Sequence, residues 1–273
     1  MEIFGSYSGT DFLVFYAVML VTAMFCGMWI AANLRAQGTR SEVSDMEEAA
    51  VLSGGIVRHA MAVSSDLLAR KGLTTGSKGH LRVSDAGIDT SAAGRSILNH
   101  REEIQFSQLQ LATASTGREI SERLTSKGLL MTDTEQLKLR WLSVLPYLAL
   151  LTIGVYRYQA GNAAGEPTGM LLVLLVLTLA LGLVRFIRLN PRTIAGNDVL
   201  HDLEVQASRM RLAPAANEAG FAVALFGTAV LVGTPWEPVH AMRANSGGGD
   251  GTGSDNDGGD SGCGGGGCGG CGG

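Results

Sequence analysis

Residues 12–32 read FLVFYAVMLVTAMFCGMWIAA, a run of 21 residues without a charged side chain. A helix of about 20 apolar residues is long enough to cross the roughly 30 Å of hydrocarbon in a bilayer. A secretory signal peptide would have a basic stretch before its apolar core, but Glu2 and Asp11 precede this run and no Lys or Arg does. We therefore expect a retained transmembrane helix over 12–32.

One face of this expected helix has small residues at every fourth position, namely Ala23, Gly27 and Ala31. Small side chains let a second helix approach closely within a membrane. The pattern predicts that this face packs against protein.

Two further apolar runs, 141–158 and 168–189, are separated by nine residues, which predicts a helical hairpin of two more membrane spans. Basic residues flank one end of each of the three runs, namely Arg35, Arg40, Lys138, Arg140, Arg185, Arg188 and Arg192. Such residues collect on the cytoplasmic side of a membrane. The sequence therefore predicts a multi-pass protein of a bacterial inner membrane with residues 33–140 in the cytoplasm.

The segment 33–140 is polar enough to fold in water. The tetrapeptide Ser44-Asp45-Met46-Glu47 has the spacing of a capping box and predicts a helix start, and Gly54-Gly55 predicts a break in that helix. A second helical pattern ends at Gly72, and residues 73–75 and 80–83 flank a Gly-rich turn, which predicts a β-hairpin.

A similar order of features returns about 56 residues later. Helical stretches are expected over 96–112 and after Thr116, and the second of them should stop at Lys127-Gly128. Short strands are then expected over 129–132 and 137–139, with a turn at Asp133 between them. Gly72 and Gly128 would then hold equivalent helix-stop positions. Helix, stop and β-wing is the layout of winged-helix modules. The sequence favours a mainly α domain with small β-wings, made of two winged-helix-like copies in tandem over 33–140. The alternative is a small helical domain with unrelated helix stops, because glycine ends helices in many folds.

Winged helices often bind DNA, but the charges here do not favour it. In the expected helix after Thr116, Arg118 and Arg123 are opposed by Glu119 and Glu122, and the whole chain has a net charge of −4. Binding to phosphates needs several unopposed bases. We expect a protein partner for this domain instead of a nucleic acid.

Residues 48–55 (EAAVLSGG), followed by Arg58 and residues 70–73 (RKGL), resemble the opening of an uncharacterised bacterial family. Its members look like membrane proteins in which such a domain and a helical hairpin precede a low-complexity Gly/Cys-rich tail. Val51 stands where an aromatic residue would be more familiar. The resemblance implies this architecture for nearly the whole chain, and it implies no activity.

Two segments follow the hairpin before the tail. Residues 196–212, with Gly196-Asn197-Asp198 as the expected cap, predict an amphipathic helix that lies on the membrane or packs on the domain. Residues 219–235 are apolar, but the segment is only 17 residues long and contains three glycines. This length is the lower limit for a helix that crosses a membrane. The sequence therefore slightly favours a re-entrant segment or a buried one, such as a strand over 221–226, over a fourth membrane span.

The tail, 246–273, holds 16 of the 38 glycines and four Asp without any Lys or Arg, so it accounts for the net charge of −4. It lacks apolar residues other than cysteine, which predicts disorder. Three cysteines with the spacing C-x4-C-x2-C are the candidate metal ligands, namely Cys263, Cys268 and Cys271. Thiolates suit Zn²⁺ or Cu⁺. Disulfides or covalent cross-links, and a drifting repeat without a ligand, are the other interpretations.

No G-x-x-x-x-G-K-[ST], H-E-x-x-H or G-x-S-x-G motif occurs, and the histidines are scattered singly. The adjacent carboxylates Glu47 and Glu48 are expected to be solvated helix caps. No catalytic residue is predicted and no enzyme is expected. The leading hypothesis is a membrane-anchored scaffold or interaction protein, and the alternative is a protein that binds or senses a soft metal through its cysteine tail.

Overall fold

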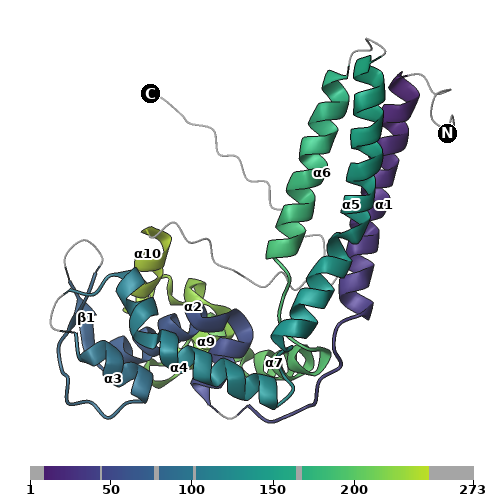
Figure 1. Ribbon diagram of the computed structural model, residues 1–273. Coiled ribbons are helices and arrows are strands. Elements are labelled where there is room, and N and C mark those ends of the chain that lie inside the picture. The colour runs from purple at the N-terminus through teal and green to yellow at the C-terminus, as the bar shows by residue number, and fades with distance from the viewer. Residues whose placement is uncertain (1–8, 44, 77–79, 101–102, 164–167, 246–273) are drawn as a thin grey trace, which may run out of the picture.

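The computed structural model describes residues 9–43, 45–76, 80–100, 103–163 and 168–245, and these residues are mainly helical. Three long helices stand side by side as a bundle, and the other elements form a folded domain at one end of it (Figure 1).

The bundle consists of α1 (Gly9–Asn33), α5 (Asp133–Ala163) and α6 (Gly169–Ile187), with α1 and α6 both packed mainly against α5. All three helices are long and apolar enough to cross a membrane. Large apolar side chains cover the outside of the bundle, among them Phe25, Trp29, Leu145 and Val176. Hydrocarbon, and not water, is the favourable solvent for such a surface.

The small-residue face of α1 packs against α5, as predicted from the sequence. Ala23, Gly27 and Ala31 are buried, and a Cβ atom added at Gly27 would lie 3.1 Å from the carbonyl oxygen of Ser143 and 3.2 Å from the Tyr147 ring. A larger residue at Gly27 would therefore push the two helices apart.

The domain contains α2 (Met46–Ala69), β1 (Leu73–Thr75), β2 (Leu81–Val83), α3 (Ala92–Leu98), α4 (Phe106–Ser126), α7 (Ile194–Gln206), α8 (Ser208–Leu212), α9 (Ala219–Phe226) and α10 (Glu237–Asn245), with short 3-10 helices at Ala216–Glu218 and Thr228–Leu231. Helix α2 lies at its centre and packs against α9 and α4. Buried side chains from before and after the helical hairpin share one core, for example Leu52, Leu124 and Val223. The domain therefore extends beyond the predicted 33–140 and includes 194–245.

The first predicted helix and hairpin are present. Asp45 caps α2 by accepting a hydrogen bond from the Glu47 amide, whereas Ser44, the cap expected from the sequence, lies outside the described residues. Strands β1 and β2 pair antiparallel with Leu73 opposite Val83.

The prediction of a second winged-helix-like copy is wrong. Residues 137–139, expected as a strand, lie inside α5, and Leu130 makes only an isolated bridge to Arg192. Helix α5 begins at Asp133 because Glu135 accepts a hydrogen bond from the Thr132 amide at 3.0 Å, which caps the helix where a turn was expected. The helical stretch expected over 96–112 is interrupted after α3, and α4 then continues through Thr116. In the described residues, the β1–β2 hairpin is the only sheet.

Helices α2 and α4 nevertheless end with the same motif. The closing bonds run from the Gly72 amide to the Leu67 carbonyl at 2.8 Å, and from the Leu129 amide to the Leu124 carbonyl at 3.0 Å. Both are Schellman ends, in which one residue has left-handed backbone angles. That residue is Lys71 in α2 (φ 63°) and Gly128 in α4 (φ 76°). The predicted equivalence of Gly72 and Gly128 is therefore wrong by one position.

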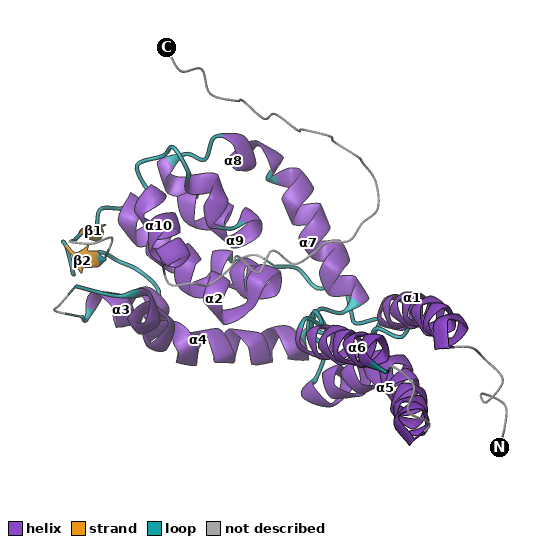
Figure 2. Ribbon diagram, turned by 90° about the horizontal axis from the view of Figure 1, so that it is seen from above, coloured by secondary structure: helices purple, strands orange, loops and turns teal. Residues whose placement is uncertain are grey.

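The apolar segment 219–235 is part of the domain, and it is mostly buried as far as Leu231, whereas Val232 is 57% exposed. Val223, Leu225 and Leu231 are at most 3% exposed, and the first half of the segment is the helix α9 instead of the expected strand. Helix α7 begins at Ile194, before the predicted cap, and its buried face packs on the domain core. Figure 2 shows α7 starting beside the bundle and running away from it along the domain.

Candidate functional site

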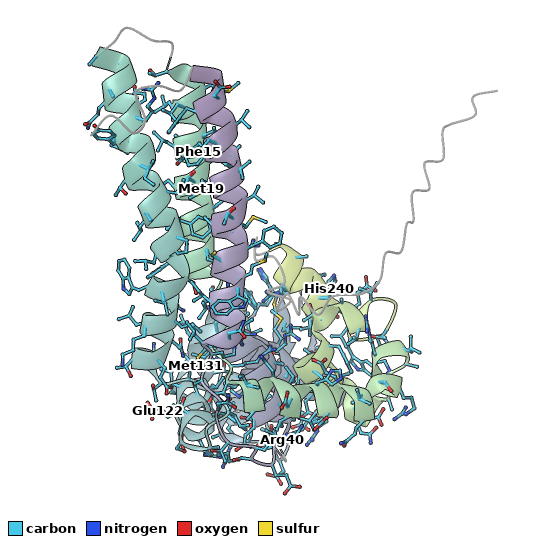
Figure 3. All side chains as sticks on the ribbon, turned by 90° about the vertical axis from the view of Figure 1, so that its right-hand side faces the viewer. Phe15, Met19, Arg40, Glu122, Met131 and His240 are labelled. Atoms are coloured by element: carbon cyan, nitrogen blue, oxygen red, sulfur yellow. The ribbon has the colours of Figure 1, made fainter. Side chains whose placement is uncertain are left out.

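Three chain segments connect the bundle to the domain, and they meet in one place: 34–41 follow α1, 127–132 precede α5, and 188–195 follow α6. The backbone bonds between them are Ile194 N–H to Ala36 O (3.0 Å), Ala195 N–H to Gln37 O (2.9 Å), Thr39 N–H to Gly128 O (3.2 Å), Thr193 N–H to Leu129 O (3.1 Å) and Met131 N–H to Pro191 O (2.9 Å). These three segments are referred to below as the junction. Figure 3 shows Met131 at the foot of the bundle and Arg40 farther from the bundle, in the lower part of the domain. Because each segment is bonded to another, none of them is a free linker.

Close backbone approaches in the junction require specific small residues. The Thr193 hydroxyl donates to the carbonyl of Gly128 at 2.9 Å and accepts from the amide of Gly196 at 3.0 Å, which caps α7. Gly38 has φ 69°, and a Cβ there would lie 2.2 Å from the Gly128 oxygen. A Cβ at Gly196 would lie 2.2 Å from the oxygen of Leu129. Glycine is thus needed at 38 both for its backbone angle and for the contact.

Arg192 links the junction to the middle of α2. That helix is interrupted at Gly54 and Gly55, whose backbone angles are non-helical. A break removes amide donors from the carbonyls of the preceding turn. The Arg192 side chain supplies donors there: its Nε donates to the Leu52 oxygen at 2.7 Å and its Nη2 donates to the Ser53 oxygen. Arg192 is only 5% exposed, so these charge-assisted bonds are made away from water.

The same break is tied to the end of α9. The Ser53 hydroxyl donates to the Ala224 carbonyl, and Nη1 of Arg58 donates to the Leu225 carbonyl at 3.3 Å. These carbonyls belong to the last turn of α9, which has no helical donors of its own. Side chains from both sides of the α2 break therefore hold α2 against α9, and the Arg192 side chain joins the same break to the segment that follows α6.

An ion pair between a buried carboxylate and a partly exposed lysine connects α2 to the end of α4. Both carboxylate oxygens of Glu48 lie 2.7 Å from the Lys127 amine, and Arg123 lies 3.9 Å from one of them. The Glu48 side chain is 5% exposed. The Lys127 carbonyl accepts a hydrogen bond from the Ser41 hydroxyl at 2.9 Å, so the pair adjoins the junction.

A second buried carboxylate, Glu47, lies 2.8 Å from Nε2 of His59, a residue with no exposed surface. Burial alone would raise the pKa of Glu47, but the hydrogen bonds of His59 and Ser91 and the attraction of the His59 charge outweigh it, so the pKa lies below its usual value. Asp66 shows the opposite balance, because burial raises its pKa despite the Arg70 guanidinium 3.1 Å away.

The expectation that Glu47 and Glu48 are solvated caps is wrong. Both are buried because α2 is covered along its first turns, where Ala49, Ala50 and Val51 are also buried. The unbroken apolar run 49–52 directly after the two acids is the sequence signal of a fully enclosed helix.

The described polar groups at this site act as braces. Arg192, Arg58 and Ser53 donate to backbone carbonyls, and Glu48 is neutralised by Lys127. Within the described ranges, no group of three or more His, Cys, Asp or Glu side chains is placed to hold a metal ion. The arrangement can transmit position and orientation between the bundle and the domain.

The candidate metal ligands Cys263, Cys268 and Cys271, and the zinc or copper expected on them, lie outside the described residues. The one free cysteine in the described part, Cys26, is exposed on α1.

The chain matches no family model, no curated protein and no solved structure. The resemblance of residues 48–73 to an uncharacterised bacterial membrane-protein family therefore stays a prediction from sequence.

Sequence reasoning missed the roles of Arg192, Thr193 and Gly38. From the sequence, Arg192 was only one of the bases used to predict the orientation in a membrane. The signal that could have identified the junction is Pro191-Arg192-Thr193, in which Thr193 stands three residues before Gly196 at a helix start.

Proposed function

We propose that this protein is a multi-pass protein of a bacterial inner membrane that holds its folded domain in a fixed orientation at the cytoplasmic face, as a scaffold for a protein partner. The junction is the observation that carries this proposal. Hydrogen bonds from all three connecting segments fix the domain to the bundle, which a simple tether would not need.

The distribution of charge supports this orientation. Arg35, Lys138, Arg140 and Arg188 lie at the end of the bundle that joins the domain. Arg157 is at the other end, where its guanidinium lies over the Phe12 ring at 5.6 Å. The basic end of a membrane protein faces the cytoplasm.

Two observations favour a scaffold that binds protein over a nucleic-acid binder: the whole chain has a net charge of −4, and four exposed bases of the domain are paired with acids. The ion pairs join Arg40 to Asp198 and Asp202, Arg70 to Asp66, Arg123 to Glu119, and Arg209 to Glu218. Bases that are already paired contribute little to the neutralisation of phosphates.

Reporter fusions test the membrane topology. A reporter active only in the cytoplasm should be active when fused at Ser77 and inactive at Gly161, with the reverse for a periplasmic reporter. Equal activity at both positions would contradict three spans with a cytoplasmic domain.

Photo-cross-linking in cells tests the scaffold. A photoreactive amino acid at Leu111 or Leu212, which are 77% and 89% exposed on the domain, should form adducts with one recurring protein. The same amino acid at Val18, 59% exposed on α1, should not trap that protein. Absence of any protein adduct from several domain positions, with normal expression, would contradict the scaffold.

The alternative function, binding of a soft metal, rests on Cys263, Cys268 and Cys271. Replacing all three by Ser should abolish any stoichiometric Cu⁺ or Zn²⁺ binding and leave membrane insertion unchanged. Metal content of the purified parent and triple variant separates the two functions: metal in the parent alone favours the tail site, and none in the parent favours the scaffold.

A further inference from the structure

Two guanidinium groups donate to backbone carbonyls at the foot of the bundle. Arg185, on the last turn of α6, donates from Nη2 to the Gly27 carbonyl of α1 at 2.9 Å. Arg35, just beyond α1, donates from Nη1 to the Arg192 carbonyl at 3.1 Å. Both acceptors are neutral backbone oxygens, so neither bond compensates a charge.

In the described residues no ion pair joins a carboxylate to Arg35 or Arg185, whereas Arg40, Arg70, Arg123 and Arg209 of the domain each have one. Burial, with the positive charge of Arg185, lowers the pKa of Arg35. Two partly buried like charges destabilise this place unless an anion joins them.

Hydrogen-bond donors remain unused at the same level. Nε of Arg185 and Nε of Arg140 are buried and have no hydrogen-bond partner in the part of the chain that the structure describes. Arg140 comes from α5 and lies over the ring of Phe186, the neighbour of Arg185, at 5.9 Å. A guanidinium group offers several N–H donors in a planar fork that matches the oxygens of a phosphate.

Aromatic side chains mark this level as the interface of a membrane. The Trp141 and Phe186 rings pack edge to face at 5.6 Å, and the indoles of Trp29 and Trp141 are 64% and 56% exposed. Exposed tryptophans gather at the depth of lipid headgroups. An anion that reaches Arg185 at this depth, beside apolar surface, has the chemistry of a phospholipid.

We propose that Arg185 and Arg35 bind the phosphate of an anionic phospholipid at the end of the bundle that adjoins the domain. This inference rests on the proposed membrane location of the three helices. Since Arg35 also bonds to Arg192, a bound lipid would contact the same junction that orients the domain.

The test measures lipid binding by the full chain in a non-ionic detergent, by mass spectrometry of the intact complex. The probes are phosphatidylglycerol, phosphatidylcholine with the same acyl chains, and inorganic phosphate. Phosphatidylglycerol should bind about tenfold more tightly than phosphatidylcholine, and inorganic phosphate should not compete at the same concentration. Arg185→Gln and Arg35→Gln should each remove about tenfold of the affinity for phosphatidylglycerol.

Arg188→Gln is the matched control, because Arg188 is an exposed base at the end of the same helix. It should change the affinity by less than about threefold. An equal loss in Arg188→Gln and Arg185→Gln would show attraction by bulk charge and overturn the proposal. Competition by inorganic phosphate as strong as that by the lipid would overturn the assignment to a lipid.

Arg185→Lys keeps the protein testable if the glutamine variant does not fold. It retains the charge but removes donors of the fork, so its affinity should fall between those of the parent and Arg185→Gln. An affinity in Arg185→Lys equal to that of the parent would overturn a phosphate bond to the fork. The reporter fusions and the cross-linking experiment fail or succeed without reference to lipid affinity, so failure of the lipid site is distinguishable from failure of the scaffold.

Discussion

Nε of Arg192 lies 2.7 Å from the carbonyl oxygen of Leu52, which joins the chain that leaves the bundle to the interrupted turn of α2. The two residues are far apart in sequence, yet each meets a hydrogen-bonding need of the other. The break at Gly54 and Gly55 leaves carbonyls that need donors, and the buried charge of Arg192 needs acceptors.

Arg192→Gln should destabilise the protein by about 2–3 kcal/mol, because the shorter neutral side chain leaves buried carbonyls of α2 without their charged donor. The expected result is a lower midpoint of thermal unfolding in detergent, followed by circular dichroism. Hydrogen exchange of the amides of Thr193 and Ile194 should also become faster, since the junction loosens.

The control for this substitution is Arg188→Gln, which removes the same charge from an exposed position four residues earlier. It should change stability by less than about 0.5 kcal/mol. Equal midpoints for the two variants would show that the bond from Arg192 to α2 contributes nothing to stability.

Gly38→Ala should destabilise by about 3 kcal/mol or more, since the new methyl group meets the Gly128 oxygen and the backbone is left-handed. Gly233→Ala is the matched control: its φ of 77° carries the same backbone penalty, but no atom lies within 4 Å of the added Cβ. It should cost about 1–2 kcal/mol. If thermal unfolding shows the same loss in both variants, the close approach at Gly38 is not tight.

Sequence patterns correctly predicted those elements that the local residue pattern alone determines. The three long apolar runs fall mainly in α1, α5 and α6, because a helix is the structure that such a length of apolar sequence favours. The Gly54–Gly55 break and the β1–β2 hairpin follow from residue chemistry alone.

The remaining errors have tertiary causes. Residues 137–139 alternate as a strand would, but the cap at Thr132 starts a helix that continues through the apolar run of α5. The apolar segment containing α9 cannot be distinguished from a short span by composition, because the core that encloses it comes from residues before the hairpin. The role of Arg192 depends on a contact with α2 that crosses the whole hairpin, and no local pattern encodes such a contact.

The pair Glu48–Lys127 offers a double-mutant cycle. Glu48→Gln should destabilise by about 1–3 kcal/mol, because it leaves the Lys127 amine without its counter-charge in a partly buried place. Lys127→Met should destabilise similarly, and the double variant should be more stable than the sum of the two effects predicts, by about 1 kcal/mol or more. Additive losses in chemical unfolding would show that the two side chains do not stabilise each other.

The hydrogen bond between Glu47 and His59 predicts a dependence of stability on pH. The folded pKa of Glu47 is lowered, so its contribution is present above the unfolded pKa of about 4.3 and is lost as the pH falls through the folded value. The free-energy difference between the parent and Glu47→Gln should be about 1–3 kcal/mol near neutral pH and should shrink below about pH 4.5. His59→Gln should reduce this acid dependence as well, since His59 supplies most of the interactions that lower the pKa. Unfolding midpoints of the parent and Glu47→Gln measured across this pH range test the prediction. A difference between the two proteins that stays constant down to about pH 3 would show that the Glu47 carboxylate is not favoured in the folded protein.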